Sequence, residues 1–379
     1  MGWQEVSIVQ SRREFVRLAS QEGANVAELC RRFEISRMTG YKWLDRARSE
    51  AEPSFEDRSR RPHCSPTRTS DAMEAAVVKL RRQHPTWGGR KIRAVLMRRG
   101  LDGVPAASTI TGILARHDLI DAEKSAAREA WIRFEHAAPN RLWQMDFKGH
   151  FELAETAARC HPLTVIDDHS RFAIELGSCA DERGTTVKRR LSAAFRRYGM
   201  PERMTMDNGS PWGNSGGEHT LTPLGVWLIQ IGIRIGHSRP GHPQSQGKNE
   251  RFNGTLKLEV LRGHTWRDHA HAQAGFDRWR EIYNFERPHE GIGLAVPADR
   301  YRMSSRPFPE ALPEIEYPTG TIVRRVSHGR LKYASRKFRV PKALHGLPVA
   351  LRPTKLDGVL DVQFIHQVVA QIDLREPTE

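Results

Sequence analysis

Three acidic residues occupy segments that could together bind metal ions. Asp146 lies in the apolar and aromatic run Trp143–Phe147, Asp207 is followed directly by an Asn-Gly pair, and Glu250 stands near the start of a helical pattern. These contexts are typical of a strand, the end of a strand and a helix, so the three residues can meet only through folding. If they meet, their carboxylates provide the hard oxygen ligands that Mg²⁺ prefers.

Such a site would suit the cleavage or joining of phosphodiesters. Two metal ions about 4 Å apart can activate the attacking oxygen, neutralise the phosphorus centre and stabilise the leaving oxygen. We expect two Mg²⁺ or Mn²⁺ ions, with Asp146 bridging both, Asp207 binding one and Glu250 binding the other. Glu218, in the polar segment before Glu250, is the weaker alternative for the third ligand.

The helical pattern around Glu250 also carries cations that could contact DNA. Residues three and four apart on a helix are neighbours, so Glu250, Asn253 and Lys257 share one face. Lys248, Arg251 and Lys257 are candidates for phosphate contacts beside the carboxylates. An ordinary solvated amphipathic helix is the alternative interpretation of this segment.

The composition points to a polyanionic partner. The chain has 379 residues, a net charge of +15 and a pI of about 10.1, which indicate several domains and favour nucleic acid as the ligand. No apolar run is long enough to span a bilayer and no signal segment opens the chain, so we expect a cytoplasmic protein. The four cysteines form no Cys-x-x-Cys pair, which favours reduced structural thiols over a zinc site or a disulfide framework.

The first segment, residues 1–50, reads as a helix-turn-helix module. Apolar periodicity predicts three short helices at the spacing of this motif, over residues 8–19, 26–33 and 36–47. Ser36 can cap the third helix, whose outward side chains can reach phosphates or base edges. These side chains are Arg37, Thr39, Tyr41 and Lys42. A three-helix bundle with a solvated polar face is the alternative.

A second helical module, residues 71–125, follows a polar linker, residues 51–70. The linker has no apolar period, and its cations either follow a DNA backbone or minor groove or are simply solvated. The linker cations that we select are Arg58, Arg60 and Arg61. The candidate DNA contacts of the second module are Arg90, Lys91, Ser108 and Thr109. Two such modules in tandem predict a long, specific DNA target.

The rest of the chain predicts an α/β domain followed by an all-β domain. Residues 136–305 alternate strands and helices, with strands expected at 141–152, 163–167, 171–176, 203–206 and 233–237 and helices at 185–198, 223–230 and 244–262. From 316 to 379, five short strands at regular spacing predict a small barrel. Its surplus of arginine and lysine suits DNA contact, and an assembly role is the alternative.

The motifs of the α/β region resemble those of one enzyme family. The run around Asp146, the segment Val165–Arg171, the Asp-Asn-Gly at Asp207 and the segment Gly241–Lys257 are similar to the integrase core of DDE transposases. These are bacterial insertion-sequence enzymes related to retroviral integrases. The resemblance implies a ribonuclease H-like core whose metal-binding carboxylates are Asp146, Asp207 and Glu250.

One spacing departs from the retroviral pattern. Between Asp207 and Glu250 lie 42 residues, more than is usual in the retroviral enzymes, and the segment Gly213–His219 looks like the added loop. Two further acids, Asp167 and Asp168, fall outside the family's metal-binding set, so we expect them to belong to a turn.

The resemblance also implies an activity and its partners. Hydrolysis would expose a 3′-hydroxyl at each end of an insertion element, and that hydroxyl would attack target DNA by direct transesterification. The partners would be double-stranded DNA, at the terminal inverted repeats of the element and in the target, bound by a dimer or tetramer at the bacterial nucleoid. A DNA-binding regulator with an inactive core and a ribonuclease H-like nuclease are the alternative functions.

Overall fold

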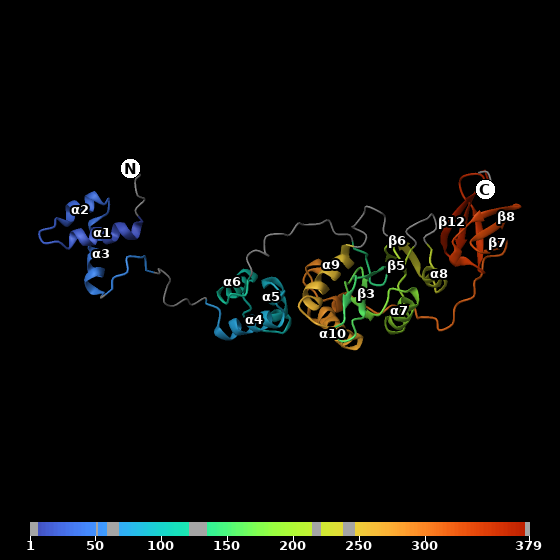
Figure 1. The fold of residues 1–379 in the computed structure, drawn as a ribbon, viewed down its shortest axis with the longest axis horizontal. Helices are drawn as coiled ribbons and strands as arrows, with labels where there is room; N and C mark the ends of the chain where they lie inside the picture. The colour runs from blue at the N-terminus through green and yellow to red at the C-terminus, as the bar shows by residue number, and fades with distance from the viewer. Residues whose placement is uncertain are drawn as a thin grey trace. The chain divides into compact units, whose positions relative to one another are not determined.

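The computed structural model describes residues 7–50, 52–58, 68–120, 135–213, 221–237 and 247–375 (Figure 1). Contacts within the chain divide it into two units, Met1–Arg68 and Thr69–Glu379. Each unit has a hydrophobic cluster of its own. Within the described ranges, no helix combines the length and the apolar character needed to cross a membrane.

The first unit is a three-helix module formed by α1 (Ile8–Ala19), α2 (Val26–Arg32) and α3 (Arg37–Ser49). A side-chain oxygen caps the first turn of each helix, from Ser7, Asn25 and Ser36 respectively. Gly40 lets α3 approach its neighbours closely, since a Cβ atom there would lie 2.6 Å from Cys30 Sγ. The three predicted helices and the predicted cap at Ser36 are confirmed.

A second three-helix module opens the other unit, with α4 (Asp71–Gln83), α5 (Gly89–Arg98) and α6 (Ala107–Arg116). Gly89 allows α5 to approach α6, since a Cβ atom there would lie 2.5 Å from the backbone oxygen of Ala107. Trp87, Ile92 and Ile110 are buried at the centre of the module. Close helix contact at a glycine therefore occurs in both modules.

A mixed sheet lies at the centre of the second unit. Its strands are β1 (Trp143–Phe147), β2 (Phe151–Glu152), β3 (Arg159–Asp167), β4 (Ala173–Cys179), β5 (Arg203–Met206) and β6 (Arg234–His237). β3 pairs antiparallel with β1, β2 and β4, whereas β1, β5 and β6 run parallel. The single strand predicted over 141–152 is wrong, because the chain turns at Gly149, whose φ of +80° favours glycine.

Helices cover both faces of this sheet, with α7 on one side of β3 and α10 on the other (Figure 1). They are α7 (Gly184–Tyr198), α8 (Pro223–Gln230), α9 (Gly247–Leu256), α10 (His269–Glu281) and the short α11 (Pro297–Arg300). Met145 of β1 belongs to the buried cluster that includes Leu191 of α7. Ile166 of β3 belongs to a second cluster with Phe252 of α9 and Phe276 of α10. This layered arrangement confirms the predicted α/β core.

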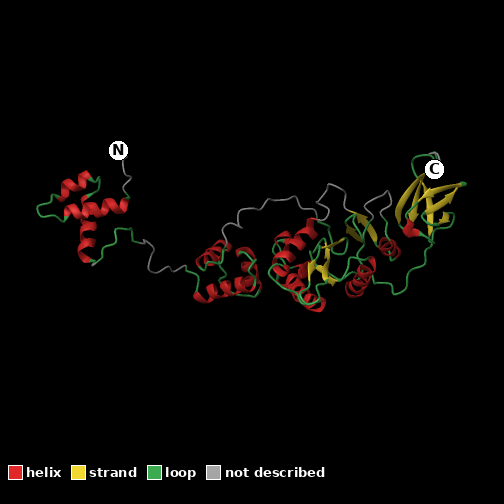
Figure 2. Ribbon diagram, in the orientation of Figure 1, coloured by secondary structure: helices red, strands yellow, loops and turns green. Residues whose placement is uncertain are grey.

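The C-terminal region is all-β, as predicted, and folds as two antiparallel sheets (Figure 2). Its strands are β7 (Ile322–Arg325), β8 (Arg330–Tyr333), β9 (Arg336–Arg339), β10 (Pro348–Pro353), β11 (Val359–Phe364) and β12 (Gln367–Asp373). One sheet has the order β12-β11-β10-β7 and the other pairs β8 with β9. The sequence did not predict β12, because Ile372 is its one fully buried residue and no regular apolar alternation marks it.

Two cysteines are packed inside the central sheet. Cys160 of β3 and Cys179 of β4 are free thiols with exposed fractions of 0% and 1%. Burial raises the pKa of the Cys160 thiol to about 11, and it raises the pKa of Cys179 as well. Cys160 Sγ lies 3.2 Å from Ser178 Oγ. Both thiols therefore serve as apolar core groups.

Candidate active site

Two of the three predicted carboxylates lie at the ends of neighbouring parallel strands. Gln144 of β1 is level with Thr205 of β5, so Asp146 near the end of β1 and Asp207 directly after β5 stand at the same edge of the sheet. Side chains alternate along a strand, which turns Gln144 and Asp146 to the face opposite the apolar residues of β1. The sheet thus brings two distant acids together.

Asp146 is partly buried and carries a charge that its surroundings do not balance. Burial, and then the negative charge of Asp207, raise the pKa of Asp146 to about 6, although Asn253 and Lys148 act in the opposite direction. Asn253 Nδ2 donates a hydrogen bond of 2.9 Å to Asp146 Oδ2. A carboxylate penalised by burial and by a second carboxylate is stabilised when a cation binds beside it.

Asp207 is held at a tight turn. The backbone N–H of Gly209 donates to Asp207 Oδ1 at 3.0 Å, as expected for an Asn-Gly turn, and His237 Nδ1 lies 2.9 Å from the backbone oxygen of Asp207. Burial raises the pKa of Asp207, and the carboxylate of Glu182 acts in the same direction. Glu182 Oε1 in turn lies 2.8 Å from His161 Nδ1.

Helix α9 presents amide side chains to the sheet. Its buried residues include Asn249 and Asn253. The backbone N–H of Asn249 donates to Gln144 Oε1 at 3.2 Å, and Thr164 Oγ1 lies 3.1 Å from Asn249 Oδ1. Sequence reasoning found Asn253 but missed the other three residues. The available signal was the presence of a glutamine in a strand as apolar as β1.

Glu250 is exposed in the first turn of α9, three residues before Asn253. Residues three apart on a helix are neighbours, so Glu250 stands beside the amide that contacts Asp146. The side chain of Glu250 has no hydrogen bond or ion pair with another residue that the structure describes. The alternative ligand Glu218 lies outside the described residues. The assignment of the third metal ligand therefore stays a prediction.

Lys248, two residues before Glu250, is paired with a buried carboxylate. Its Nζ forms an ion pair with Asp168 Oδ1, which also accepts a hydrogen bond of 2.9 Å from Gln144 Nε2. The backbone N–H of His136 donates to Asp168 Oδ2 at 3.0 Å. These bonds tie the start of α9 to the sheet, while the predicted contact of Lys248 with DNA stays a prediction.

The donor set at this edge fits a divalent cation. Asp146 and Asp207 supply carboxylate oxygens with raised pKa values, and Asn253 Oδ1 is a buried amide oxygen without a hydrogen-bond partner among the described residues. Oxygen atoms of these two kinds are the ligands of hard cations such as Mg²⁺. Within the described ranges, no cluster of three or more Asp, Glu, His and Cys side chains has metal-binding geometry.

Most of the predicted DNA contacts lie on the surface. The exposed ones are Arg37, Tyr41, Lys42, Arg58, Arg90, Ser108, Thr109, Arg251 and Lys257, whereas Thr39 and Lys91 are half-buried. Two of the exposed cations have acidic neighbours, since Arg58 forms an ion pair with Glu50 and Arg90 lies 3.4 Å from Glu290. Arg60 and Arg61 lie outside the described residues. Contact with DNA stays a prediction for all of these residues.

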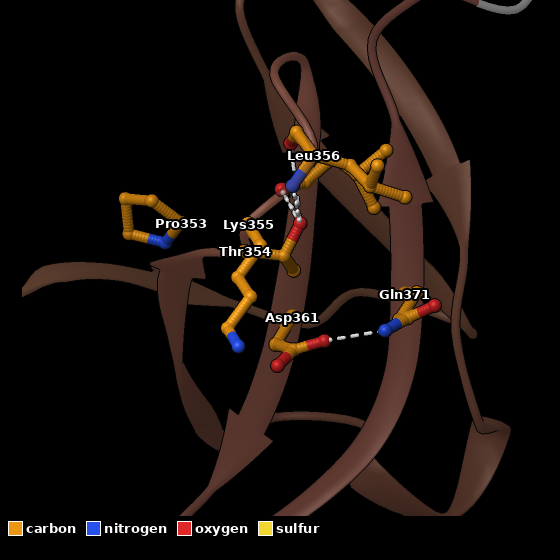
Figure 3. Close-up of a pocket in the computed structure, with 7 residues that line it drawn as sticks. Pro353, Thr354, Lys355, Leu356, Asp361 and Gln371 are labelled. Carbon is orange, nitrogen blue, oxygen red and sulfur yellow. Dashed lines mark hydrogen bonds between the residues drawn. The ribbon is translucent and has the colours of Figure 1, made fainter.

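A pocket in the C-terminal domain is separate from the carboxylates (Figure 3). Its lining consists of Pro353, Thr354, Lys355, Leu356, Val359, Asp361 and Gln371. Gln371 Nε2 donates a hydrogen bond of 2.7 Å to Asp361 Oδ1, so the single acid of the pocket already has a partner. The pocket contains none of the predicted catalytic residues.

Models of known protein families match most parts of the chain. The integrase core domain matches residues 136–243 and 231–297. A helix-turn-helix domain matches residues 11–63 and a homeodomain-like domain matches residues 39–114. The C-terminal domain of IS481 family transposases matches residues 321–379.

Two proteins of insertion elements are similar to this chain. The uncharacterized 31.7 kDa protein of insertion element IS407 from Burkholderia multivorans is 26% identical over 238 residues, which cover 62% of this chain and 82% of that protein. The uncharacterized 39.2 kDa protein of insertion element IS476 from Xanthomonas euvesicatoria is 29% identical over 239 residues, which cover 62% of this chain and 65% of that protein.

Among solved structures, the integrase catalytic core domain of HTLV-2 in complex with magnesium has 14% identity and a TM-score of 0.33, over 44% of this chain and 99% of that one. The core matches an integrase domain, the helical modules match a homeodomain-like domain and the C-terminal domain matches a transposase domain. The chain therefore contains an integrase core domain and the C-terminal domain of IS481 family transposases, and it is similar to proteins of insertion elements.

Proposed function

We propose that this transposase cleaves and joins DNA strands with two Mg²⁺ or Mn²⁺ ions held by Asp146, Asp207 and Glu250. The observation that carries the proposal is the pair of aspartates at one sheet edge, where burial and mutual repulsion raise the pKa of Asp146 to about 6. Cations would relieve that repulsion. When bound, the ions would stabilise the charge that develops on the phosphoryl and leaving oxygens.

The protein groups around the carboxylates have the role of positioning them. Asn253 orients Asp146 through its hydrogen bond of 2.9 Å, and Gln144 links β1 to the backbone of α9. The ion pair between Lys248 and Asp168 keeps the first turn of α9, which carries Glu250, against the sheet. Fixed placement of this kind lowers the reorganisation needed when charge develops on the substrate.

The proposed reaction has two steps, each of which forms one P–O bond and breaks one. In the first step, a water oxygen attacks the phosphorus at the element end, and the departing 3′-oxygen takes a proton and becomes a hydroxyl. In the second step, that 3′-hydroxyl gives up its proton and attacks a target phosphodiester, and the departing 3′-oxygen of the target strand takes up a proton. No covalent bond to the protein is needed.

The proposed partners are two element ends and a target duplex. We assign DNA recognition to the helical modules, residues 1–50 and 71–125, with the linker 51–70, chemistry to residues 136–305 and an accessory role to residues 316–379. Joining both ends at one target requires a homo-oligomer, a dimer or a tetramer, on the DNA. We place this assembly in the bacterial cytoplasm, at the nucleoid.

The proposal is tested by a strand-transfer assay. Labelled DNA that carries the ends of the element, taken from either side of the gene, is incubated with a target plasmid. We expect joints with the natural chain, and a fall of more than about 100-fold in Glu250→Gln, since loss of groups that merely support a metal ligand already costs about 10- to 100-fold. The matched control is Glu152→Gln, which changes an exposed acid of the same core and should leave joining unchanged.

Other outcomes would separate the alternatives. Nicks without joints indicate a ribonuclease H-like nuclease, and tight binding without either product indicates a regulator with an inactive core. Joints that persist in Glu250→Gln contradict the third ligand, and Glu218→Gln is then the next variant to assay.

A further inference from the structure

The second helical module contacts the core through one face of α5. The guanidinium of Arg98 donates hydrogen bonds of 2.6 and 2.8 Å to the two carboxylate oxygens of Asp299, in α11. Arg90, eight residues earlier in α5, lies 3.4 Å from Glu290. Residues eight apart share one broad face of a helix, so both ion pairs come from the same side of α5. The module and the core belong to one unit, Thr69–Glu379.

A further contact with the core lies just before α5, at Thr86. Its Oγ1 donates a hydrogen bond of 2.7 Å to Glu259 Oε1. The side chain of Glu259 is only 10% exposed, and it also accepts hydrogen bonds from Trp279 Nε1 at 3.0 Å and from Arg287 Nε at 3.1 Å. Because two groups of the core already hold this carboxylate, it provides a fixed anchor for the module.

An apolar side chain of the core joins the hydrophobic cluster of the module. Ile282, which directly follows α10, packs against the buried cluster that contains Trp87, Ile92 and Ile110. The contact between module and core thus has an apolar part flanked by ion pairs and hydrogen bonds. This is the usual anatomy of a protein interface, with apolar groups at its centre and polar groups at its rim.

The anchor Glu259 lies on the helix that carries Glu250. α9 continues without a break into the helical turn Lys257–Leu261, so the two glutamates are nine residues apart, about 13 Å along the helix. The ion pair of Lys248 with Asp168 ties the start of this helix to the sheet. A single helix therefore links the second module to the proposed third metal ligand.

We propose that α5 docks the second helical module on the core, and that this contact fixes the distance between the DNA sequence bound by α6 and the phosphodiester at the carboxylates. Ser108 and Thr109 of α6 are exposed, so DNA and the core would contact different helices of the module. Arg90 and Arg98 then belong to the interface with the core and not to the DNA surface. The inference rests on the proposed function, because it assumes that the module binds the element end on which the core acts.

The docking is tested by hydrogen–deuterium exchange of the full chain without DNA or metal. Arg98→Met and Asp299→Asn each remove the paired bonds, and each should speed exchange in α5 and over residues 282–300 by about two- to fivefold, the range to which one exposed ion pair corresponds. The double variant should add nothing further, since both changes break the same contact. The control Arg99→Met changes the exposed arginine next to Arg98 and should leave exchange unchanged.

The distance is tested on a duplex that carries an element end. An iron chelate is attached to the cysteine of Glu152→Cys, an exposed position of the core, in a chain that also carries Cys64→Ser. The chelate cuts the DNA nearest to it whether or not the enzyme is active, and the natural docking contact should confine these cuts to a few neighbouring nucleotides. Arg98→Met and Asp299→Asn should each lower the share of cuts at the preferred position by about two- to fivefold, and Arg99→Met should not.

Each other outcome contradicts a stated part of the proposal. Unchanged exchange in the docking variants, or an equal rise in the control, would overturn the docking. Faster exchange with an unaltered cutting pattern would overturn the fixed distance. Tighter DNA binding by Asp299→Asn, with the pattern unaltered, would show that Arg98 contacts a phosphate instead. Neither readout uses the catalytic activity of the enzyme, so absence of strand transfer would contradict the catalytic proposal alone.

Discussion

The core contains two pairs of aspartates with different partners, although burial raises the pKa of Asp167 in the second pair as it does in the first. Asp146 and Asp207 meet at the edge of the sheet, where burial and mutual repulsion raise the pKa of Asp146 to about 6. Asp167 ends β3, Asp168 directly follows it, and they are 0% and 1% exposed, yet each accepts several hydrogen bonds or an ion pair. The comparison teaches that burial alone does not identify a functional acid. The proposed metal ligands differ in that a second carboxylate, Asp207, also raises the pKa of Asp146.

The donors to the second pair come from inside the protein. Asp167 accepts hydrogen bonds from the backbone N–H groups of Asn140 at 2.7 Å and Ser170 at 2.8 Å. Asp168 is paired with Lys248 and accepts the hydrogen bond from Gln144. A buried acid with this many partners has a structural role, whereas the first pair leaves room for a cation from solution.

The largest effect on the unfolding free energy is expected when Asp168 loses the cation with which it is paired. Lys248→Met leaves the charge of Asp168 buried without its cation, and such a loss costs about 3–5 kcal/mol of unfolding free energy. Lys248→Met/Asp168→Asn should recover most of that cost, because no buried charge remains. Urea unfolding at neutral pH measures both variants. Lys257→Met, which changes an exposed lysine of the same segment, is the control, and an equal effect there would contradict the structural role of Lys248.

The next largest effect on stability is expected when Asp146 loses its negative charge. A pKa raised from 3.8 to about 6 means that the folded protein loses stability as pH rises through this window, and that the loss is complete above it. Asp146→Asn should therefore be more stable than the natural chain by about 3 kcal/mol at pH 7 in EDTA, and equal to it below about pH 4.

Urea unfolding between pH 4 and pH 7 measures this difference. Addition of Mg²⁺ should raise the stability of the natural chain and leave Asp146→Asn unchanged. A gain in stability that is the same at every pH would show that Asp146 does not carry an unfavourable charge.

The smallest effect is expected at the side chain that donates a hydrogen bond to Asp146. Asn253→Ala removes the hydrogen bond of 2.9 Å, so the pKa of Asp146 should rise above 6, and the unfolding free energy should fall by about 1 kcal/mol. Carboxyl NMR titration in EDTA measures the pKa. Thr255→Ala removes another polar side chain of α9, whose hydroxyl bonds within the helix to Arg251, and should not move the titration.

Local patterns were enough to predict most of the fold. The apolar periods predicted the three helices of the first helical module to within a few residues, the cap at Ser36 was predicted as well, and the run at Asp146 predicted β1. These local patterns failed for elements in which buried and exposed residues do not alternate regularly. β12 is mostly half-buried, and the segment 141–152 reads as one strand because a glycine turn is hard to distinguish from a glycine within a strand.

The candidate site was predicted in part. Asp146, Asp207 and Glu250 follow from their motifs, but the partners of these acids depend on contacts across the fold. Lys248 reads as a surface cation because its counter-ion, Asp168, lies 80 residues away. The buried polar link between Thr164 and α9 likewise spans two elements that are distant in the chain. Only the folded sheet reveals which charges are balanced.

The buried thiols of the central sheet bear on the chemical durability of the enzyme. Oxidants and alkylating agents react with the thiolate, and burial raises the pKa of both Cys160 and Cys179. A reagent can reach these sulfur atoms only after the packing of helices on the sheet opens, since Cys160 belongs to the cluster that includes α9 and α10 and Cys179 to the cluster that includes α7. Oxidative damage to this core therefore depends on how often the core opens as well as on how much oxidant surrounds it.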